Sequence, residues 1–150
     1  MIRVQADPFD PGRELDTFAP ADDRIGGIAS FVGTVRGTES GPRLIAMTLE
    51  HYPGMTERKL GEIEAEARRR WPLVDCLIIH RYGRLLPREP IVLVATASAR
   101  RDAAFDACRF IIDWLKTQAP FWKFEETESG SSWVEARESD EVAEARWKSL

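Results

Sequence analysis

The sequence is poor in the residues that build metal sites and redox centres. Among its 150 residues it has two cysteines, Cys76 and Cys108, and two histidines, His51 and His80. The cysteines form no CxxC motif and each lies in an apolar run, which predicts two buried thiols rather than sulfur carriers. The histidines fall in predicted strands, without an HxxxH motif or a Cys/His cluster. We therefore interpret them as half-buried structural residues and expect no metal site.

Long apolar runs, excess positive charge and nucleotide-binding loops are also missing. No segment approaches the roughly 20 apolar residues that cross a bilayer as a helix, and residues 1–5 lack the pattern of a signal peptide. The formal net charge is −4, whereas a general nucleic-acid-binding protein carries a basic face. There is no GxSxG or phosphate-loop motif. These absences argue against a membrane protein and a nucleic-acid-binding protein.

What remains is the composition of an ordinary globular chain, with 43% apolar and 31% charged residues. The length allows one domain with a sizeable core, and no repeat or linker divides it, so we expect residues 1–150 to form a single domain. Periodicity and the positions of glycine and proline predict the secondary structure. The predicted strands are 2–6, 26–35, 44–52, 74–82 and 91–97, the helices are 12–18, 55–71 and 102–119, and 121–127 with 132–136 form a closing hairpin.

The order of these elements indicates the fold class. From residue 44 onward the order is β-α-β-β-α-β, which predicts a split antiparallel sheet with both main helices on one face. Extra N-terminal strands precede this unit and the C-terminal hairpin closes it. We therefore expect an α+β fold, and we expect the charged tail from residue 137 to lie on the surface as a helix or an extended chain.

Several cations lie beside predicted turns or at the ends of predicted elements, and they are candidate ligands for an anionic substrate. They are Arg36, Arg100, Arg101, Lys116, Lys123 and Arg137. Arg100 and Arg101 precede a helix, where free N–H groups and the positive end of the dipole bind anions. Cations at that end cost a few tenths to about 1 kcal/mol, which a bound anion would offset. The alternative, to which we give equal weight, is that both arginines are solvated and bind no ligand.

The two lysines differ in their sequence context. Lys116 is predicted to lie in the last turn of a helix, where the dipole alone explains a cation. Lys123 follows Phe121 and Trp122 on a half-buried strand. Aromatic neighbours would strip water from its ammonium group and make it a nucleophile or general base.

Four segments together resemble the large-subunit family of molybdopterin synthase. They are LEHYPGMT at 49–56, IHRYG at 79–83, LKTQAPFWK at 115–123 and WVEARESD at 133–140. The similarity extends over residues 31–140 without a large gap, and the combination of the last two segments is highly specific.

The resemblance implies a cytoplasmic sulfurtransferase of molybdenum cofactor biosynthesis with an α/β-hammerhead fold and no cofactor. Members of the family convert cyclic pyranopterin monophosphate to molybdopterin. The sulfur comes from the C-terminal Gly-Gly thiocarboxylate of a small ubiquitin-like subunit. A homodimer of the large subunit lies at the centre of a heterotetramer, with no nucleic acid and no membrane involved. A non-catalytic adaptor that docks a ubiquitin-like tail is the alternative function.

The resemblance also implies roles for residues at matching motif positions. Its active-site lysines fall on Lys116 and Lys123. Its substrate-binding positions fall on Phe31, Thr34, Val35, Arg36, Arg101, Phe124, Glu125 and Arg137. Arg100 stands where many members have histidine; it keeps the positive charge for substrate binding but does not titrate near neutrality.

The spacing of two of these residues predicts how such a site is assembled. Arg101 and Lys116 are 15 positions apart, which is roughly 22 Å along a helix at about 1.5 Å per residue. A pterin monophosphate is shorter than that. If both residues serve one site, Lys116 and Lys123 come from one subunit and Arg100 and Arg101 from the other, with two sites per two-fold dimer. Otherwise the two arginines lie outside the site.

Overall fold

The computed structural model describes residues 1–19, 21–38, 41–134 and 138–148. The elements follow the chain as β1 (Ile2–Gln5), α1 (Pro11–Thr17), β2 (Gly27–Thr34), β3 (Leu44–His51), α2 (Met55–Arg70), β4 (Leu73–Arg81), β5 (Gly83–Leu85), β6 (Pro90–Ser98), α3 (Arg101–Gln118), β7 (Phe121–Thr127), β8 (Gly130–Val134) and α4 (Glu138–Ala145). Within these ranges no helix has both the length and the apolar character needed to cross a membrane.

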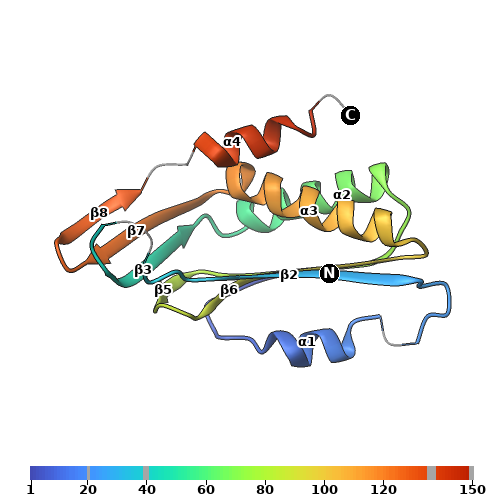
Figure 1. Ribbon diagram of the computed structural model, residues 1–150, viewed down its shortest axis with the longest axis horizontal. Coiled ribbons are helices and arrows are strands. Elements are labelled where there is room, and N and C mark those ends of the chain that lie inside the picture. Colours follow the sequence, from blue (N-terminus) through green and yellow to red (C-terminus); the bar gives the residue numbers. More distant parts are fainter. Residues whose placement is uncertain (20, 39–40, 135–137, 149–150) are drawn as a thin grey trace.

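The strands form two four-stranded sheets. The first has the order β1-β4-β6-β2 and the second the order β5-β3-β7-β8. In Figure 1, α2 and α3 cover one side of the first sheet, α1 lies on its other side, and β3, β7 and β8 extend from one end. Strand β2 is therefore an edge strand, and one of its long sides is not paired within its sheet.

The α+β class and the placement of both main helices on one face are confirmed. The structure differs from a single antiparallel sheet because β3 and β7 pair in the second sheet, and because β1 runs parallel to β4. Strand β5, which was not predicted, contributes to the separation of the strands into two sheets. Gly83 has a positive φ of 91°, and it turns the chain out of β4 so that β5 pairs with β3, with Gly83 opposite Leu49.

The main core lies between the first sheet and the two long helices. Helix α3 buries one apolar face in this core, from Ala104 through Cys108 and Ile111 to Leu115. The prediction of two buried thiols is confirmed, since Cys76 and Cys108 are both free and buried. Burial raises the pKa of Cys76 to about 12 and that of Cys108 to about 11, so both stay protonated and chemically inert.

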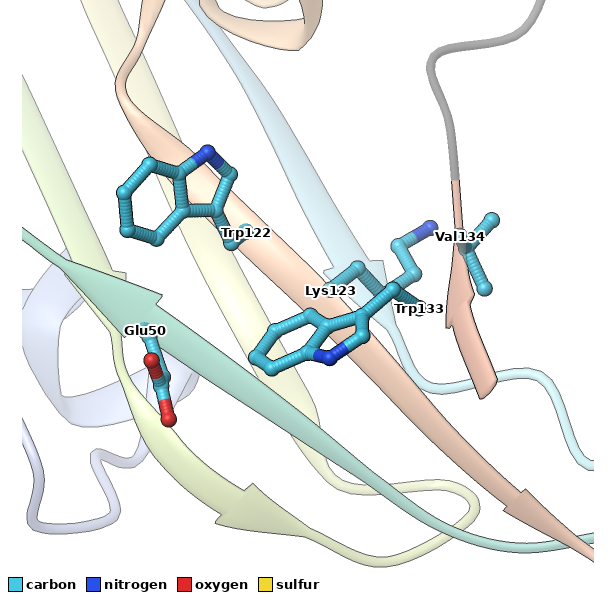
Figure 2. Close-up of a pocket in the computed structure, with 5 residues that line it drawn as sticks. All are labelled: Glu50, Trp122, Lys123, Trp133 and Val134. Atoms are coloured by element: carbon cyan, nitrogen blue, oxygen red, sulfur yellow. The ribbon is translucent and has the colours of Figure 1, made fainter. Parts of the chain in front are cut away.

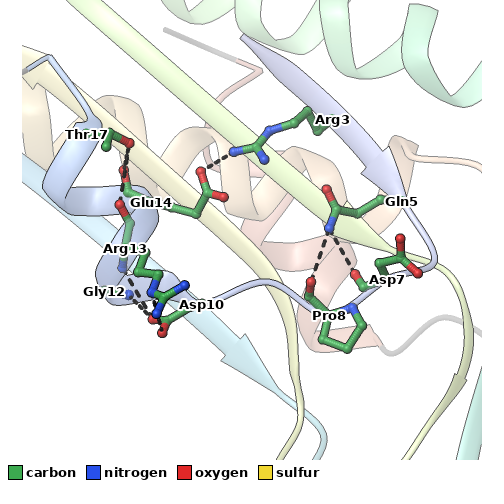
Figure 3. Close-up of polar contacts among 9 residues, drawn as sticks. All are labelled: Arg3, Gln5, Asp7, Pro8, Asp10, Gly12, Arg13, Glu14 and Thr17. Carbon is green, nitrogen blue, oxygen red and sulfur yellow. Dashed lines mark hydrogen bonds and ion pairs between the residues drawn. The ribbon is translucent and has the colours of Figure 1, made fainter.

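A smaller core fills the other side of the first sheet, beneath α1. This helix begins after Asp10, whose carboxylate accepts hydrogen bonds from the N–H groups of Gly12 and Arg13, a common N-cap arrangement. Figure 3 shows this cap together with the ion pair of Arg3 and Glu14, which ties β1 to α1. The N-terminal segment therefore stabilises the face of the sheet opposite α2 and α3.

The C-terminal helix α4 is held against the end of α3. Trp147 is 6% exposed and its indole N–H donates a hydrogen bond to Asp113 at 2.7 Å. Its ring packs edge-on against Trp71 and Phe110, with centroid distances of 5.6 and 5.8 Å. The prediction of a surface tail is therefore wrong for this residue, because its indole packs into the core against Trp71 and Phe110.

Candidate active site

A groove of about 1040 Å³ lies where the ends of β2, β6 and β4 in the first sheet meet the end of α3 and strands β3 and β7 of the second sheet. The residues of β2 and of the segment that follows it line the groove consecutively from Phe31 to Gly37. Successive residues of a strand point to opposite faces of its sheet, so residues from both faces of β2 border the groove. Phe31, Thr34, Val35 and Arg36 are therefore brought to one wall of this groove.

The opposite wall contains the two lysines. Lys116 and Lys123 both line the groove, although one is helical and the other lies on a strand. Leu115 is buried and holds the last turn of α3 against the core. Pro120 ends the helix, and β7 begins directly after it at Phe121. This short connection places the two ammonium groups on the same groove.

Strand alternation divides β7 into two faces. Phe121, Lys123 and Glu125 line the groove, whereas Trp122 and Phe124 point to the other side of the sheet. Phe121 is therefore the aromatic neighbour of Lys123 on the groove side. The prediction that Trp122 also shields Lys123 there is wrong, because Trp122 lies on the other face of β7. Trp122 is 50% exposed and contacts Tyr52 at a ring distance of 4.7 Å.

A smaller hollow of about 330 Å³ lies around the end of β8. It is lined by Glu50, Trp122, Lys123, Trp133 and Val134. Figure 2 shows the Lys123 amine directed toward Val134 and away from the Trp122 ring. Lys123 therefore borders both hollows, as does Val134.

The charge of the groove suits an organic anion. Among the described residues of the groove, Arg36, Lys116 and Lys123 are basic and Glu125 and Asp140 are acidic. A concave surface with this charge concentrates anions. Among the residues that the structure describes, no three His, Cys, Asp or Glu side chains are grouped as metal ligands.

His80 is a groove residue that sequence reasoning set aside. It is 6% exposed rather than half-buried, and it lines the groove beside the lysines. Burial, with smaller contributions from the charges of Lys116 and His51, lowers the pKa of His80 from 6.5 to about 4. Its imidazole is therefore neutral at physiological pH. Its position in the IHRYG segment, at the end of a strand, was the signal available in the sequence.

The arginines that precede α3 lie far from these residues. Arg101 begins α3 beside Gly27, at the start of β2, where a Cβ added to Gly27 would lie 3.5 Å from the Arg101 Cα atom. Thr34, by contrast, is at the other end of that strand. Arg100 and Arg101 are exposed and, though both are within the described ranges, neither lines the groove. Arg137 lies outside the described residues.

Comparison with known proteins places the chain in a family. A family model described as the MoaE protein matches residues 4–118. The chain belongs to the MoaE family. The matched range contains β2 and all of α3, and so it includes both Arg36 and Lys116.

Relatives of this MoaE chain share its full length. The molybdopterin synthase catalytic subunit of Pseudomonas aeruginosa is 56% identical over 147 residues, which cover 98% of each chain. A MoaE structure from Burkholderia ambifaria has a TM-score of 0.83 and 52% identity, covering 98% of this chain and 97% of that one. The structure of molybdopterin synthase from Staphylococcus aureus has a TM-score of 0.81 and 29% identity, covering 89% and 96% respectively. The fold of this chain is therefore shared with these proteins over most of its length.

Proposed function

We propose that this chain is the catalytic subunit of molybdopterin synthase. It transfers sulfur from the C-terminal thiocarboxylate of a small ubiquitin-like subunit to cyclic pyranopterin monophosphate, which yields molybdopterin. The convergence of Lys116, Lys123 and Arg36 on one groove carries this proposal, in a chain 56% identical to a protein named as such a subunit.

The groove supplies what this reaction requires of the large subunit. Arg36 attracts the anionic groups of the substrate and of the incoming chain end. One lysine stabilises the negative charge that develops as sulfur adds, and the other transfers protons. Phe31, Thr34, Val35 and Glu125 shape the walls around them, with Phe124 supporting β7 from its other face. Both cysteines are buried in the core, so the sulfur is delivered from outside the chain.

The remaining cations are assigned to a second copy of the chain. Lys116 and Arg101 lie at opposite ends of the 18-residue helix α3, roughly 22 Å apart, so a single pterin does not reach both in one subunit. Ile28 and Phe105, 51% and 66% exposed, lie near the Arg101 end and are the kind of apolar surface that a second copy covers. A two-fold homodimer would bring Arg100 and Arg101 of one subunit to the groove of the other.

A subunit-mixing experiment tests the shared site. An Arg101→Ala chain and a Lys116→Ala chain, each strongly impaired as a homodimer at limiting pterin concentration, are co-expressed with different tags, and the mixed dimer is purified and assayed at that concentration. One of its two sites is then intact, so we expect up to about half of the wild-type activity per dimer. An inactive mixed dimer of proven composition would show that both residues serve the same subunit.

A single-turnover assay separates catalysis from an adaptor role. The purified chain is mixed with the thiocarboxylated partner and the pterin substrate, and molybdopterin is measured. We expect product with the intact partner and none when its last two glycines are removed. An adaptor would bind the partner without forming product, and equal product from free sulfide would exclude the partner as the sulfur donor.

We assign the assembly to the cytoplasm. The two cysteines are unpaired and buried, as is usual for proteins of reducing compartments. Two large and two small subunits would form the heterotetramer, with the large-subunit dimer at its centre.

A further inference from the structure

His80 lies where the two sheets meet at the groove. It belongs to β4 of the first sheet, opposite Val92 of β6. Its ring stacks on Phe121 of the second sheet, with a centroid distance of 3.9 Å and an interplanar angle of 16°. The imidazole is thus fixed in orientation from both sides, although one part of it borders the groove that contains the lysines.

The hydrogen bonding of the ring determines which nitrogen carries the proton. Nδ1 lies 2.8 Å from the backbone carbonyl oxygen of Arg81. A carbonyl oxygen only accepts hydrogen bonds, so Nδ1 must donate, and in the neutral ring Nε2 then keeps its lone pair. His80 therefore offers an uncharged acceptor at a position that backbone and packing hold in place.

The charged and titratable neighbours of this acceptor come from several elements. Lys116 of α3 lines the same groove as His80, and the ring of His51 of β3 packs near Phe121, on which the His80 ring stacks. The charges of both neighbours lower the pKa of His80. Arg81, next along β4, directs its guanidinium elsewhere: it donates to the carbonyl of Ala6 and pairs with Glu89 at 3.6 Å. Lys116 is therefore the cation of the groove that acts on the ring of His80.

We propose that His80 is a positioning residue for Lys116: once the substrate is bound in the groove, the Nε2 atom of His80 accepts a hydrogen bond from the Lys116 ammonium group and directs that group toward the substrate. The inference rests on the proposed catalytic role of Lys116. An uncharged acceptor suits this purpose, because a carboxylate in its place would pair with the lysine and cancel the charge that attracts the substrate. The neutral ring orients the cation without reducing the charge of the groove.

Two isosteric variants separate positioning from simple packing. The amide of His80→Gln places an oxygen near the position of Nε2, whereas His80→Asn places its amide near Nδ1 and can still donate to the Arg81 carbonyl. We expect His80→Gln to keep the single-turnover rate within about threefold of wild type. We expect His80→Asn to lower it roughly 10- to 100-fold, the range for one hydrogen bond to a charged group, with the KM for the pterin unchanged.

The ordering of the two variants decides the question. If His80 only supports the fold through the Arg81 carbonyl, Asn should be the better replacement, and that result would overturn the proposal. Lys116→Ala is measured alongside. If it is fully active, the assignment of Lys116 to catalysis fails; if it is inactive while His80→Asn turns over normally, only the role of His80 fails.

A measurement on the unaltered ring covers the case of a variant that does not fold. In ¹⁵N NMR spectra of the full chain with the pterin substrate bound, we expect Nδ1 of His80 to be protonated and Nε2 to carry no proton. Lys116→Met should shift the Nε2 resonance, and Lys123→Met, the matched change on the other lysine, should leave it in place. A proton on Nε2, or an Nε2 chemical shift that does not change in Lys116→Met, would disprove the proposed contact.

Discussion

The two ends of α3 carry similar charges in very different surroundings. At its C-terminal end Lys116 follows a buried leucine, complements the helix dipole and faces a groove with Arg36 and Lys123. At its N-terminal end Arg100 and Arg101 are exposed, and the N-cap residue Arg100 makes no side-chain capping hydrogen bond. One end is built into a site within its own chain, and the other is not.

This difference shows why a residue's role depends on what surrounds it rather than on its charge. Lysine at the C-terminal end is locally favourable, whereas two arginines at the N-terminal end oppose the dipole. The two arginines at the N-terminal end of α3 are explained if they bind an anionic substrate that lies in the groove of another subunit. Four predictions can break or sharpen this contrast.

The largest effect is expected at the groove end of α3. Lys116→Ala and Lys123→Ala should each lower the single-turnover rate roughly 10²- to 10⁴-fold, the usual contribution of a positioned acid or base. The free energy of unfolding should change by less than about 0.5 kcal/mol, as for most surface substitutions. Lys59→Ala, on the exposed side of α2, is the control. Near-normal rates in both groove variants would remove this end from the active site.

The burial of His80 predicts how the same end responds to acid. Its folded-state pKa of about 4 lies below its ordinary 6.5, so the unfolded chain binds the proton more readily. Its contribution is therefore fully present above pH 6.5 and is lost as the pH falls toward 4. Between pH 7 and 4.5 the loss should be about 2–3 kcal/mol.

Urea unfolding of the wild type and His80→Gln at both pH values measures this contribution. The variant lacks the titrating group, so it should lose less stability between the two values. Acidic residues affect both proteins equally. Parallel losses would mean that His80 is not held in its neutral form by burial.

A smaller effect is expected at the N-terminal end of α3. Arg101→Ala should weaken binding of the pterin substrate by roughly 1.5–3 kcal/mol, the range for a hydrogen bond to a charged group. Calorimetric titration of the assembled complex measures it. Arg109→Ala, an exposed arginine two turns further along the same helix, is the matched control. Equal affinity in wild type and Arg101→Ala would leave this end of the helix without a role in substrate binding.

The smallest effect should come from Arg100→His. Below about pH 6.5 the histidine is protonated and keeps the charge, whereas at pH 8 it is neutral. We therefore expect wild-type activity near pH 6 and a loss of roughly two- to fivefold at pH 8, the size of an exposed charge interaction. A rate profile over this range checks it. A tenfold loss at pH 6 would show that the guanidinium geometry matters, not its charge.

The sequence by itself determined most of the local structure, because helix and strand periodicity, proline stops and apolar stripes act over short distances. It predicted the α+β class, both main helices and the buried thiols. Its motifs also predicted Lys116, Lys123 and Arg36 as site residues, and all three line the groove. Strand alternation further implies that Trp122 and Lys123 point to opposite faces of β7. That residues 1–150 form one domain stays a prediction.

Only the tertiary structure decided how these pieces meet. The pairing of β3 with β7 in a second sheet, the turn at Gly83 that starts β5 and the aromatic packing of Trp147 depend on contacts between distant segments. The same holds for His80, whose burial beside Lys116 arises because Phe121 of one sheet covers the end of a strand of the other. A short sequence pattern indicates on which face of its helix or strand a residue lies, but it does not indicate which distant segment packs against that face. Assembly of the groove therefore required the fold.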